Sequence, residues 1–331
     1  MATLEDIARA LGVSKSTVSK ALNGAEDVSH AMRQSVLEKA VELGYSKVFR
    51  TASAPRLAIF VSNMAYKNPE DFGFDIITGF RKMAEPNGYC VEIIPLDRAM
   101  QLRIRYDQFM VSGNYCGGCF LGLSLQDPWM EDFGSCRTPT VLYDNWVPGN
   151  PKITYVGADN VEAMGLVVAY LKSLNHTRIG YLSSALGAYV YQQRYQAFSR
   201  AMEENGLEFD DSRCGTSYHI SECISKHLPR LLDAGCTAIV CSHDYLANNV
   251  MIRCTELGLR VPEDISILGF DDVPQSRYTL PPLSTIRQNR VELGKSAYCA
   301  LSSQLSGVPL STFLLHVELI QRASCAAKAV K

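Results

Sequence analysis

The residues of this 331-residue chain whose types and spacing best suit chemistry form a short polar face near its beginning. This face carries ammonium and hydroxyl groups and no acidic side chain: Lys15, Ser16, Thr17, Ser19 and Lys20. Such groups can donate hydrogen bonds to phosphate oxygens and to base edges in the grooves of DNA. The charge agrees, because residues 1–56 hold eight Lys and Arg against six Asp and Glu, whereas the remainder is net negative by four.

Two short helices joined by a glycine turn must position this face. Apolar residues at helical spacing predict a first helix over about 4–10, which Gly12 can end in the left-handed conformation. Ser14 can cap a second helix that begins at Lys15. A third helix over 29–43 closes a small core, without which two short helices could not bury enough surface. These elements predict a helix-turn-helix headpiece, whose second helix lies in the major groove.

The alternative for these three helices is an ordinary helical bundle with solvated polar faces. The tight turn and the basic, Ser/Thr-rich face favour DNA contact over that alternative. Lysine can donate to guanine O6 or N7 and serine is compatible with several bases, so the residues do not define an operator sequence. Side chains around the two helices are candidate phosphate anchors: Thr3, Ser14, Thr17, Ser19, Asn23 and Ser29.

The composition suits a cytoplasmic protein with a headpiece and one large or two medium globular units. With 47% hydrophobic and 20% charged residues, the chain is long enough for a sizeable core. No stretch approaches the roughly 20 apolar residues of a membrane helix, so we expect no membrane partner. The first residues predict headpiece helices rather than a secretory signal peptide.

Eleven cysteines are scattered without a metal-ligand pattern, and their odd number argues against a disulfide framework. The pair Cys116 and Cys119 has the C-x-x-C spacing of a redox couple or of half a zinc site. No second pair or matching histidines accompany it, and the surrounding GNYCGGCFLGL predicts a buried strand. We therefore expect structural cysteines and no metal or cofactor, with oxidation sensing as the alternative for this pair.

Beyond residue 56 short apolar runs alternate with helical stretches. This order predicts parallel sheets with helices on both faces. We expect one sheet over about 57–157 and a second over about 160–283, facing each other across a cleft, with the chain returning to the first lobe after Leu283. The predicted fold class is therefore an all-α helix-turn-helix headpiece followed by a bilobed α/β domain with two parallel sheets.

In such sheets ligands bind beyond the carboxyl ends of the strands. Four polar residues near these ends and three aromatic residues are the candidate effector contacts: Asp144, Arg194, His243, Asp271, Phe72, Trp146 and Tyr218. An arginine and an aspartate that converge from one lobe suit a ligand rich in hydroxyl groups, and aromatic rings stack on sugar faces. The sequence therefore predicts a small-molecule effector of carbohydrate type.

Each of these polar residues also has a structural interpretation. Arg194, which we place at the start of the helix after RIGYLSS, could form a surface ion pair, and Asp271 could cap a helix. His243 could donate to a ligand hydroxyl, pair with an anionic ligand, or be a satisfied core residue. For Asp244 and Asp272 we favour structural caps over ligand contacts.

Catalysis is not expected. The consecutive Ser242, His243 and Asp244 cannot form a triad, because neighbours on a strand alternate faces. No G-x-S-x-G elbow, P-loop or G-x-G-x-x-G is present. The alternative to a regulator is a stand-alone sugar-binding protein, which would need a secretory signal in place of the headpiece.

Two separate motifs carry a family resemblance. The string LEDIARALGVSKSTVSKALNG, followed by VS and by a helix ending in ELGY, resembles the headpiece of the lactose-repressor family of bacterial transcription factors. The string TAIVCSHDYLANNVMIRCTELGLRVPEDISILGFDDVPQSRYTLPPLSTIRQ resembles the effector-domain signature of the same family. The two motifs also occur in the order that this family has.

The resemblance implies a bilobed, periplasmic-binding-protein-like fold and a homodimer on a pseudo-palindromic operator of double-stranded DNA, with tetramer formation left open. It assigns base reading to Lys15, Ser16 and Lys20, and effector contacts to Arg194 and Asp271. The implied domains are a DNA-binding domain, a hinge or linker, and an effector-binding and dimerisation domain: 1–46, 47–56 and 57–331. Within the last, lobe 1 comprises about 57–157 plus 284–318, and lobe 2 comprises about 158–283 plus the C-terminal end.

The linker departs most from the family pattern, and His243 departs as well, since the family more often has Asn or another small polar residue there. Family members usually follow Gly-Tyr with a proline, then a hinge helix whose leucine wedges into the minor groove. This chain has the shorter GYSKVFRTASAPRLAIF, without that proline or leucine. Val48 or Phe49 could act as the wedge, but we favour a flexible tether whose Lys47 and Arg50 touch phosphate, and hence less bent operator DNA.

Overall fold

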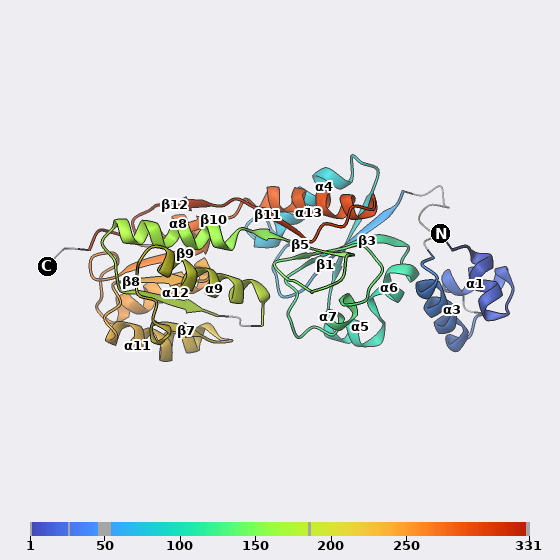
Figure 1. Cartoon of the computed structure of the whole chain (residues 1–331), viewed down its shortest axis with the longest axis horizontal. Coiled ribbons are helices and arrows are strands. Elements are labelled where there is room, and N and C mark those ends of the chain that lie inside the picture. The colour runs from blue at the N-terminus through green and yellow to red at the C-terminus, as the bar shows by residue number, and fades with distance from the viewer. Residues whose placement is uncertain (1, 26, 46–53, 185–186, 329–331) are drawn as a thin grey trace. The chain divides into compact units, whose positions relative to one another are not determined.

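The computed structural model describes residues 2–25, 27–45, 54–184 and 187–328. Three helices come first, and two sheets with their covering helices follow (Figure 1). Residue contacts divide the chain into a first unit, Met1–Lys67, Gly73–Val156 and Val291–Phe313, and a second unit, Asn68–Phe72, Gly157–Arg290 and Leu314–Lys331. Across the described residues, none of the helices has the length and apolar character needed to cross a bilayer.

The headpiece consists of three helices around one small apolar core. They are α1 (Leu4–Leu11), α2 (Lys15–Leu22) and α3 (His30–Glu42). The core is made by side chains from all three helices and by one residue that follows them: Ile7, Ala8, Val18, Ala21, Leu22, Val36, Leu37, Ala40 and Tyr45. Because each helix alone exposes its apolar stripe to water, the three stabilise one another only as a packed set.

Local capping explains where these helices begin and end. The hydroxyl of Ser14 accepts a hydrogen bond from the backbone N–H of Thr17 at 3.0 Å, which starts α2 at Lys15 as predicted. Gly12 ends α1 with a φ of +66°, a conformation that favours glycine. Ser29, which the sequence pattern places inside the third helix, lies just before it and caps it.

The first unit contains a six-stranded sheet in the order β11-β5-β4-β3-β1-β2. Its strands are β1 (Arg56–Val61), β2 (Cys90–Pro95), β3 (Tyr115–Leu121), β4 (Thr140–Tyr143), β5 (Ile153–Ala158) and β11 (Thr312–Leu315). Its helices are α4 (Phe72–Ala84), α5 (Arg98–Arg103), α6 (Tyr106–Ser112), α7 (Trp129–Phe133) and α13 (Arg290–Leu305). The pairs β1–β2, β1–β3, β3–β4 and β4–β5 are parallel, which confirms the predicted parallel sheet.

Helices α4 and α13 lie side by side although more than two hundred residues separate them in the chain (Figure 1). Two glycines allow their backbones to approach. A Cβ atom on Gly79 would lie 2.0 Å from the carbonyl oxygen of Val291, and one on Gly294 would lie 1.9 Å from that of Ile76. Any larger residue at either position would therefore push the two helices apart.

The second unit contains another six-stranded sheet, in the order β12-β10-β9-β8-β6-β7. Its strands are β6 (Ile179–Ser183), β7 (Cys214–Thr216), β8 (Ala238–Cys241), β9 (Ser266–Asp271), β10 (Ser284–Arg287) and β12 (Glu318–Ile320). Its helices are α8 (Asn160–Ser173), α9 (Tyr189–Glu204), α10 (Ile220–Glu222), α11 (Leu228–Asp233) and α12 (Asp244–Glu256), with short turns η1 (Asp211–Arg213), η2 (Cys223–His227) and η3 (Pro274–Arg277). Apolar clusters fill both faces of this sheet.

Strand β10 differs from the sequence-based expectation. It pairs in parallel with β9, so the chain leaves the second sheet after Arg287 rather than after Leu283. The strand β12 arrives later and pairs with β10 in the antiparallel direction. The pattern misses this strand because β10 is only four residues long and two of its side chains, Ser284 and Thr285, are polar although buried.

The C-x-x-C pair lies inside β3, where all seven residues are buried. Burial raises the pKa of Cys116 to about 11 and that of Cys119 to about 12, so both thiols stay protonated near neutral pH. Cys116 lies where the register between β1 and β3 shifts, and its thiol donates to the carbonyl oxygen of Arg56 at 3.1 Å. All eleven cysteines of the chain are free. The geometry agrees with the structural interpretation of this pair.

Candidate functional site

The candidate DNA contacts lie on α2, and we call Lys15, Ser16, Thr17, Ser19 and Lys20 the α2 polar face. Lys15, Ser16 and Lys20 are exposed. Each lysine is held by an acidic side chain of the headpiece: the Lys15 ammonium lies 2.6 Å from Glu5, and Lys20 pairs with Asp27. Such exposed ion pairs contribute little, so phosphate or base acceptors can replace these carboxylates at low cost.

The candidate phosphate anchors perform structural roles in the free headpiece. Thr3 forms a reciprocal capping box with Asp6, whose carboxylate accepts from the Thr3 backbone N–H and hydroxyl at 2.8 Å. Ser14 and Ser29 are N-caps, and the Asn23 amide donates to the carbonyl oxygen of Ser19 at 2.8 Å. These residues therefore define the ends of the headpiece helices. Of the predicted DNA contacts, Lys47 and Arg50 lie outside the described residues, as do Val48 and Phe49.

The second unit brings Arg194 and Asp271 together. Arg194 lies in the second turn of α9 rather than at its start, and it is only 2% exposed. Its guanidinium donates to Asn160 Oδ1 at 3.1 Å and to the carbonyl oxygen of Ser242 at 2.6 Å, and it lies 3.6 Å from the centre of the Phe270 ring. The distance from its Nη1 to Asp271 Oδ1 is 3.8 Å. The surface ion-pair interpretation of Arg194 is therefore wrong.

Asp271 ends β9 in an unusual backbone conformation. Its φ is +117°, and that of the following Asp272 is +48°. Positive φ values are uncommon outside glycine and concentrate at functional sites, where surrounding contacts hold them. The side-chain amide of Gln288, one residue beyond β10, donates to Asp271 Oδ1 at 2.7 Å. The carboxylate is thus oriented between an arginine and an amide, and it does not cap a helix.

His243 is the N-cap of α12. Its Nδ1 accepts a hydrogen bond from the backbone N–H of Leu246 at 3.1 Å, so the proton of the neutral ring resides on Nε2. Nε2 lies 2.6 Å from Ser184 Oγ and therefore donates to it. Burial lowers the pKa of His243 to about 4, and the positive charge of Arg194 acts in the same direction. The ring is therefore neutral near pH 7, which disfavours its pairing with an anionic ligand.

Asp244 is a buried structural residue but not the helix cap, since His243 occupies that position. Its carboxylate accepts from the backbone N–H of Val273 at 3.0 Å and from the hydroxyls of Ser276 at 2.6 Å and Thr285 at 2.5 Å. Burial raises its pKa to about 7, and the neighbouring Asp271 charge contributes. These bonds tie the start of α12 to β10 and to the segment after β9.

Asp272 is the centre of an arginine cluster rather than a ligand contact. Arg287 donates to its carboxylate at 2.7 Å, Arg322 donates to the other oxygen, and Arg277 lies 3.9 Å away. The pKa of Asp272 is lowered, because these arginine contacts outweigh the opposing effect of burial. This cluster links the end of β9 to β10 and to the chain that follows β12.

The remaining predicted contacts are distributed over both units. Asp144 and Trp146 follow β4 in the first unit, where Asp144 has a φ of +53° and the Trp146 side chain is 40% exposed. Phe72 opens α4 but belongs to the second unit, with the guanidinium of Arg290 at 5.5 Å from its ring centre. Tyr218 follows β7 and is 58% exposed.

Four further residues contact Arg194, Asp271 or His243, although the sequence pattern does not single them out. Asn160 contacts Arg194, Gln288 contacts Asp271, and Ser184 contacts His243. The ring of Tyr191 lies 5.7 Å from that of His243. Asn160, Ser184 and Gln288 each lie within two residues of a strand end. The strand-end rule, applied to every strand, would therefore find these three.

Comparison with known proteins agrees with both parts of this structure. Residues 3–47 match the family described as bacterial regulatory proteins, lacI family, and residues 168–325 match a periplasmic binding protein-like domain. The HTH-type transcriptional repressor CytR of Escherichia coli (strain K12) is 30% identical over 336 residues, covering 98% of this chain and 97% of CytR. The HTH-type transcriptional regulator reg1 of Streptomyces lividans is 29% identical, with 98% and 96% covered.

Solved structures show the same fold. The transcriptional regulator CelR–cellobiose complex superposes with a TM-score of 0.70 at 22% identity, covering 98% of this chain and 100% of that chain. The lac repressor dimer bound to operator and the anti-inducer ONPF superposes with a TM-score of 0.67 at 22% identity, covering 98% and 99%. These likenesses confirm the predicted fold class of a helix-turn-helix headpiece followed by a periplasmic-binding-protein-like domain.

The capped helix-turn-helix and the two-sheet domain define a DNA-binding transcriptional regulator of the type that small molecules control. Its curated relatives are transcriptional regulators and not enzymes, as the sequence indicates. The chain belongs to the lacI family of bacterial regulatory proteins.

Proposed function

We propose that this protein is a repressor that binds a pseudo-palindromic operator as a homodimer, and that a carbohydrate-like effector controls this binding. The observation that carries the effector assignment is the buried Arg194, held 3.8 Å from Asp271 among neutral polar side chains. In this mechanism the effector shifts operator affinity because it binds the operator-binding and released states unequally.

On the operator side, the α2 polar face supplies the base contacts. Lys15, Ser16 and Lys20 are exposed at one end and along the outer face of α2, where the first turns of a recognition helix meet base edges. The capping residues around α1, α2 and α3, together with Lys47 and Arg50, are proposed to touch phosphate. Affinity should therefore fall steeply as salt rises.

On the effector side, the charges around Arg194 favour a neutral ligand with several hydroxyl groups. The guanidinium and the Asp271 carboxylate balance each other, and His243 is uncharged at neutral pH. Such fixed donors and acceptors match the hydroxyl groups of a sugar better than a strongly anionic group. The structural relative CelR was solved as a complex with the sugar cellobiose. Proposed further contacts are Phe72, Asp144, Trp146 and Tyr218.

Exposed apolar side chains in the second unit support self-association. Tyr245 and Ile252 on α12 are 68% and 52% exposed, and Tyr278 and Leu280 are 83% and 91% exposed. The bond from Ser276 to Asp244 places the segment before Tyr278 against the start of α12. Apolar groups gathered this way on one lobe favour burial in a dimer. The solved lac repressor relative is a dimer on its operator; pairing of dimers stays open.

The domain division proposed for this function is the one drawn from the sequence: 1–46, 47–56 and 57–331, acting in the cytoplasm. The competing function, a stand-alone sugar-binding protein, requires no headpiece. The reciprocal capping box and the N-caps at Ser14 and Ser29 stabilise the helix ends of the headpiece, which favours the regulator.

A thermal-shift screen with sugars, sugar phosphates and nucleosides tests the effector assignment. We expect a neutral sugar to raise the melting temperature of the wild type, and Arg194→Ala and Asp271→Ala to abolish that shift. Arg200→Ala is the matched control, because Arg200 lies on the same helix in an exposed pair with Glu204. A ligand that stabilises the wild type and both site variants equally would place the effector elsewhere.

The operator assignment is tested by selecting bound sequences from random DNA with the full-length protein. We expect a two-fold related site and weaker binding by Lys15→Ala and Lys20→Ala. The control is Lys39→Ala, which removes the same charge from α3. If the wild type enriches no sequence, or if all three variants weaken binding alike, base reading by α2 is refuted.

A further inference from the structure

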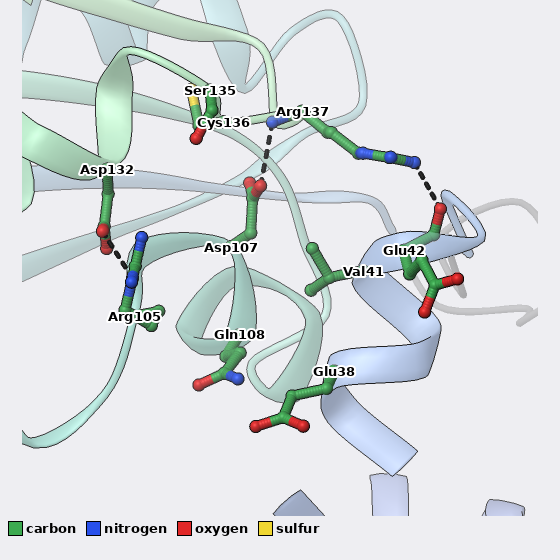
Figure 2. Close-up of a pocket in the computed structure, with 10 residues that line it drawn as sticks. All are labelled: Glu38, Val41, Glu42, Arg105, Asp107, Gln108, Asp132, Ser135, Cys136 and Arg137. Carbon is green, nitrogen blue, oxygen red and sulfur yellow. Dashed lines mark hydrogen bonds and ion pairs between the residues drawn. The ribbon is translucent and has the colours of Figure 1, made fainter. Parts of the chain in front are cut away.

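Within the first unit, helix α3 of the headpiece packs against α6 of the effector domain (Figure 2). Val111 on α6 lies against the apolar cluster of the headpiece, the cluster that includes Val36, Leu37 and Tyr45. Tyr45, the last described residue before the linker, is only 4% exposed. The headpiece core is therefore completed by a side chain from the effector domain.

A polar contact supplements this packing at the end of α3. The guanidinium of Arg137 donates to the carbonyl oxygen of Glu42, the last residue of that helix (Figure 2). Helix C-termini leave carbonyl groups unpaired and carry partial negative charge, so a cation there stabilises the helix end. The backbone N–H groups of Arg137 and Thr138 donate to Asp107 at 2.9 and 3.1 Å, which fixes the loop that carries the arginine.

The contact leaves the DNA-reading helix available. It uses α3 and Tyr45, whereas Lys15, Ser16 and Lys20 on α2 remain exposed. The docked position therefore retains the whole α2 polar face for base contact. A headpiece held in this way also loses less orientational freedom when it binds DNA than one on a free tether.

We propose that Val111 and Arg137 anchor the headpiece to the effector domain in its operator-binding state, so that lobe 1 itself, through α3 and α6, holds the reading helix. An anchor of this kind would hold the headpiece without the proline after Gly-Tyr and the hinge leucine that family members usually have. The proposal rests on operator binding as the proposed function. It adds a second connection between headpiece and effector domain besides the covalent one.

Two pairs of single variants of the full-length protein test the anchor. Arg137→Ala removes the cation from α3, and Arg105→Ala is its control, since Arg105 lines the same pocket but pairs with Asp132 of the effector domain. Val111→Asp places a charge in the packed contact, and Ser112→Asp places the same charge on the adjacent, exposed residue of α6. All four changes leave the headpiece sequence untouched.

Hydrogen exchange on peptides covering 38–45 and 106–112 reports docking directly, and fluorescence anisotropy with the selected operator reports affinity. We expect Arg137→Ala and Val111→Asp to speed exchange in 38–45 and to weaken operator binding by about three- to tenfold, the factor for roughly one hydrogen bond. The controls should change neither measurement. If both test variants give the same result, misfolding of one variant does not explain it.

Three results would overturn the proposal. Exchange in 38–45 that is identical in the wild type and both test variants would mean that the headpiece does not dock. Tighter operator binding by the test variants would make the contact inhibitory instead. If the test and control variants weaken operator binding equally, the effect comes from the change in net charge and not from the anchor. If the wild type binds no operator specifically, the proposed function is refuted. The exchange data would still report separately whether the headpiece docks.

Discussion

Acidification should remove the contribution that His243 makes to the stability of the fold. The ring is held neutral in the fold, with a pKa lowered to about 4 by burial and by Arg194, whereas the unfolded chain has the ordinary value of 6.5. A histidine whose folded pKa is depressed binds fewer protons in the folded state. Its contribution to stability is therefore fully present above about pH 6.5 and is lost as the pH falls toward 4.

The size of the effect follows from these two values. At pH 5 the unfolded chain carries this proton almost fully, and the folded protein carries it in about one molecule in ten. Between pH 7 and pH 5 the loss is about 2 kcal/mol. Asp244, whose pKa is raised to about 7, acts in the opposite direction, because its protonation on acidification favours the fold. The comparison must therefore be made against a variant that retains Asp244.

His243→Asn is that variant, since asparagine can still cap α12 but does not titrate. Urea unfolding at pH 7 and pH 5 should show the wild type losing about 2 kcal/mol more than the variant. Asp244, His176 and His227 titrate in both proteins, so their effects cancel in the difference. NMR of ¹³C-labelled histidine, with the His243 signal assigned by its disappearance in the variant, should show a neutral ring at pH 6. A midpoint near 6.5, or equal losses in both proteins, would refute the geometry given for this ring.

Three other outcomes can be checked independently. Gly269→Ala should lower the free energy of unfolding by about 1–3 kcal/mol, because its Cβ would lie 2.2 Å from Oδ1 of the Asp244 carboxylate. Three donors hold that carboxylate in place, one on Oδ1 and two on Oδ2. Gly165→Ala in α8 should instead raise the free energy of unfolding by roughly 0.5–1 kcal/mol, since nothing lies within 4 Å of that Cβ position; chemical denaturation distinguishes the two. Lys47→Ala should reduce the slope of log K against log salt by about 1, because Lys47 is proposed to touch phosphate; an unchanged slope would exclude that contact.

The features that the sequence predicts well follow from spacing along the chain or from the general rule for strand ends. Ser14 caps α2 because its hydroxyl and the Thr17 amide are three residues apart, and this spacing is visible in the chain itself. The strand-end rule and the family motifs pair Arg194 with Asp271, and the structure brings them to 3.8 Å. The first contact follows from local spacing, and the second from the meeting of strand ends at one edge of a parallel sheet together with the family resemblance.

The features that the sequence pattern misses depend on distant partners. His243 rather than Asp244 caps α12, because Asp244 is drawn away by donors from Ser276 and Thr285 and the ring is positioned by Ser184. The spacing of apolar residues along the sequence does not predict such bonds. Likewise, β10 is a strand because β9 and β12 flank it, although its own four residues carry little strand signal.

The late arrival of the chain in both sheets has a consequence for how the protein is made. Strand β11 and helix α13 complete the first unit, and β12 pairs with β10 in the second. On a ribosome, neither sheet can gain its last edge strand, β11 or β12, until residues 312–320 have emerged. The two lobes therefore cannot mature one after the other, and a chain stalled near residue 280 would expose open sheet edges in both. Until β11 and β12 have emerged, the edges that they cover in the folded sheets stay unpaired.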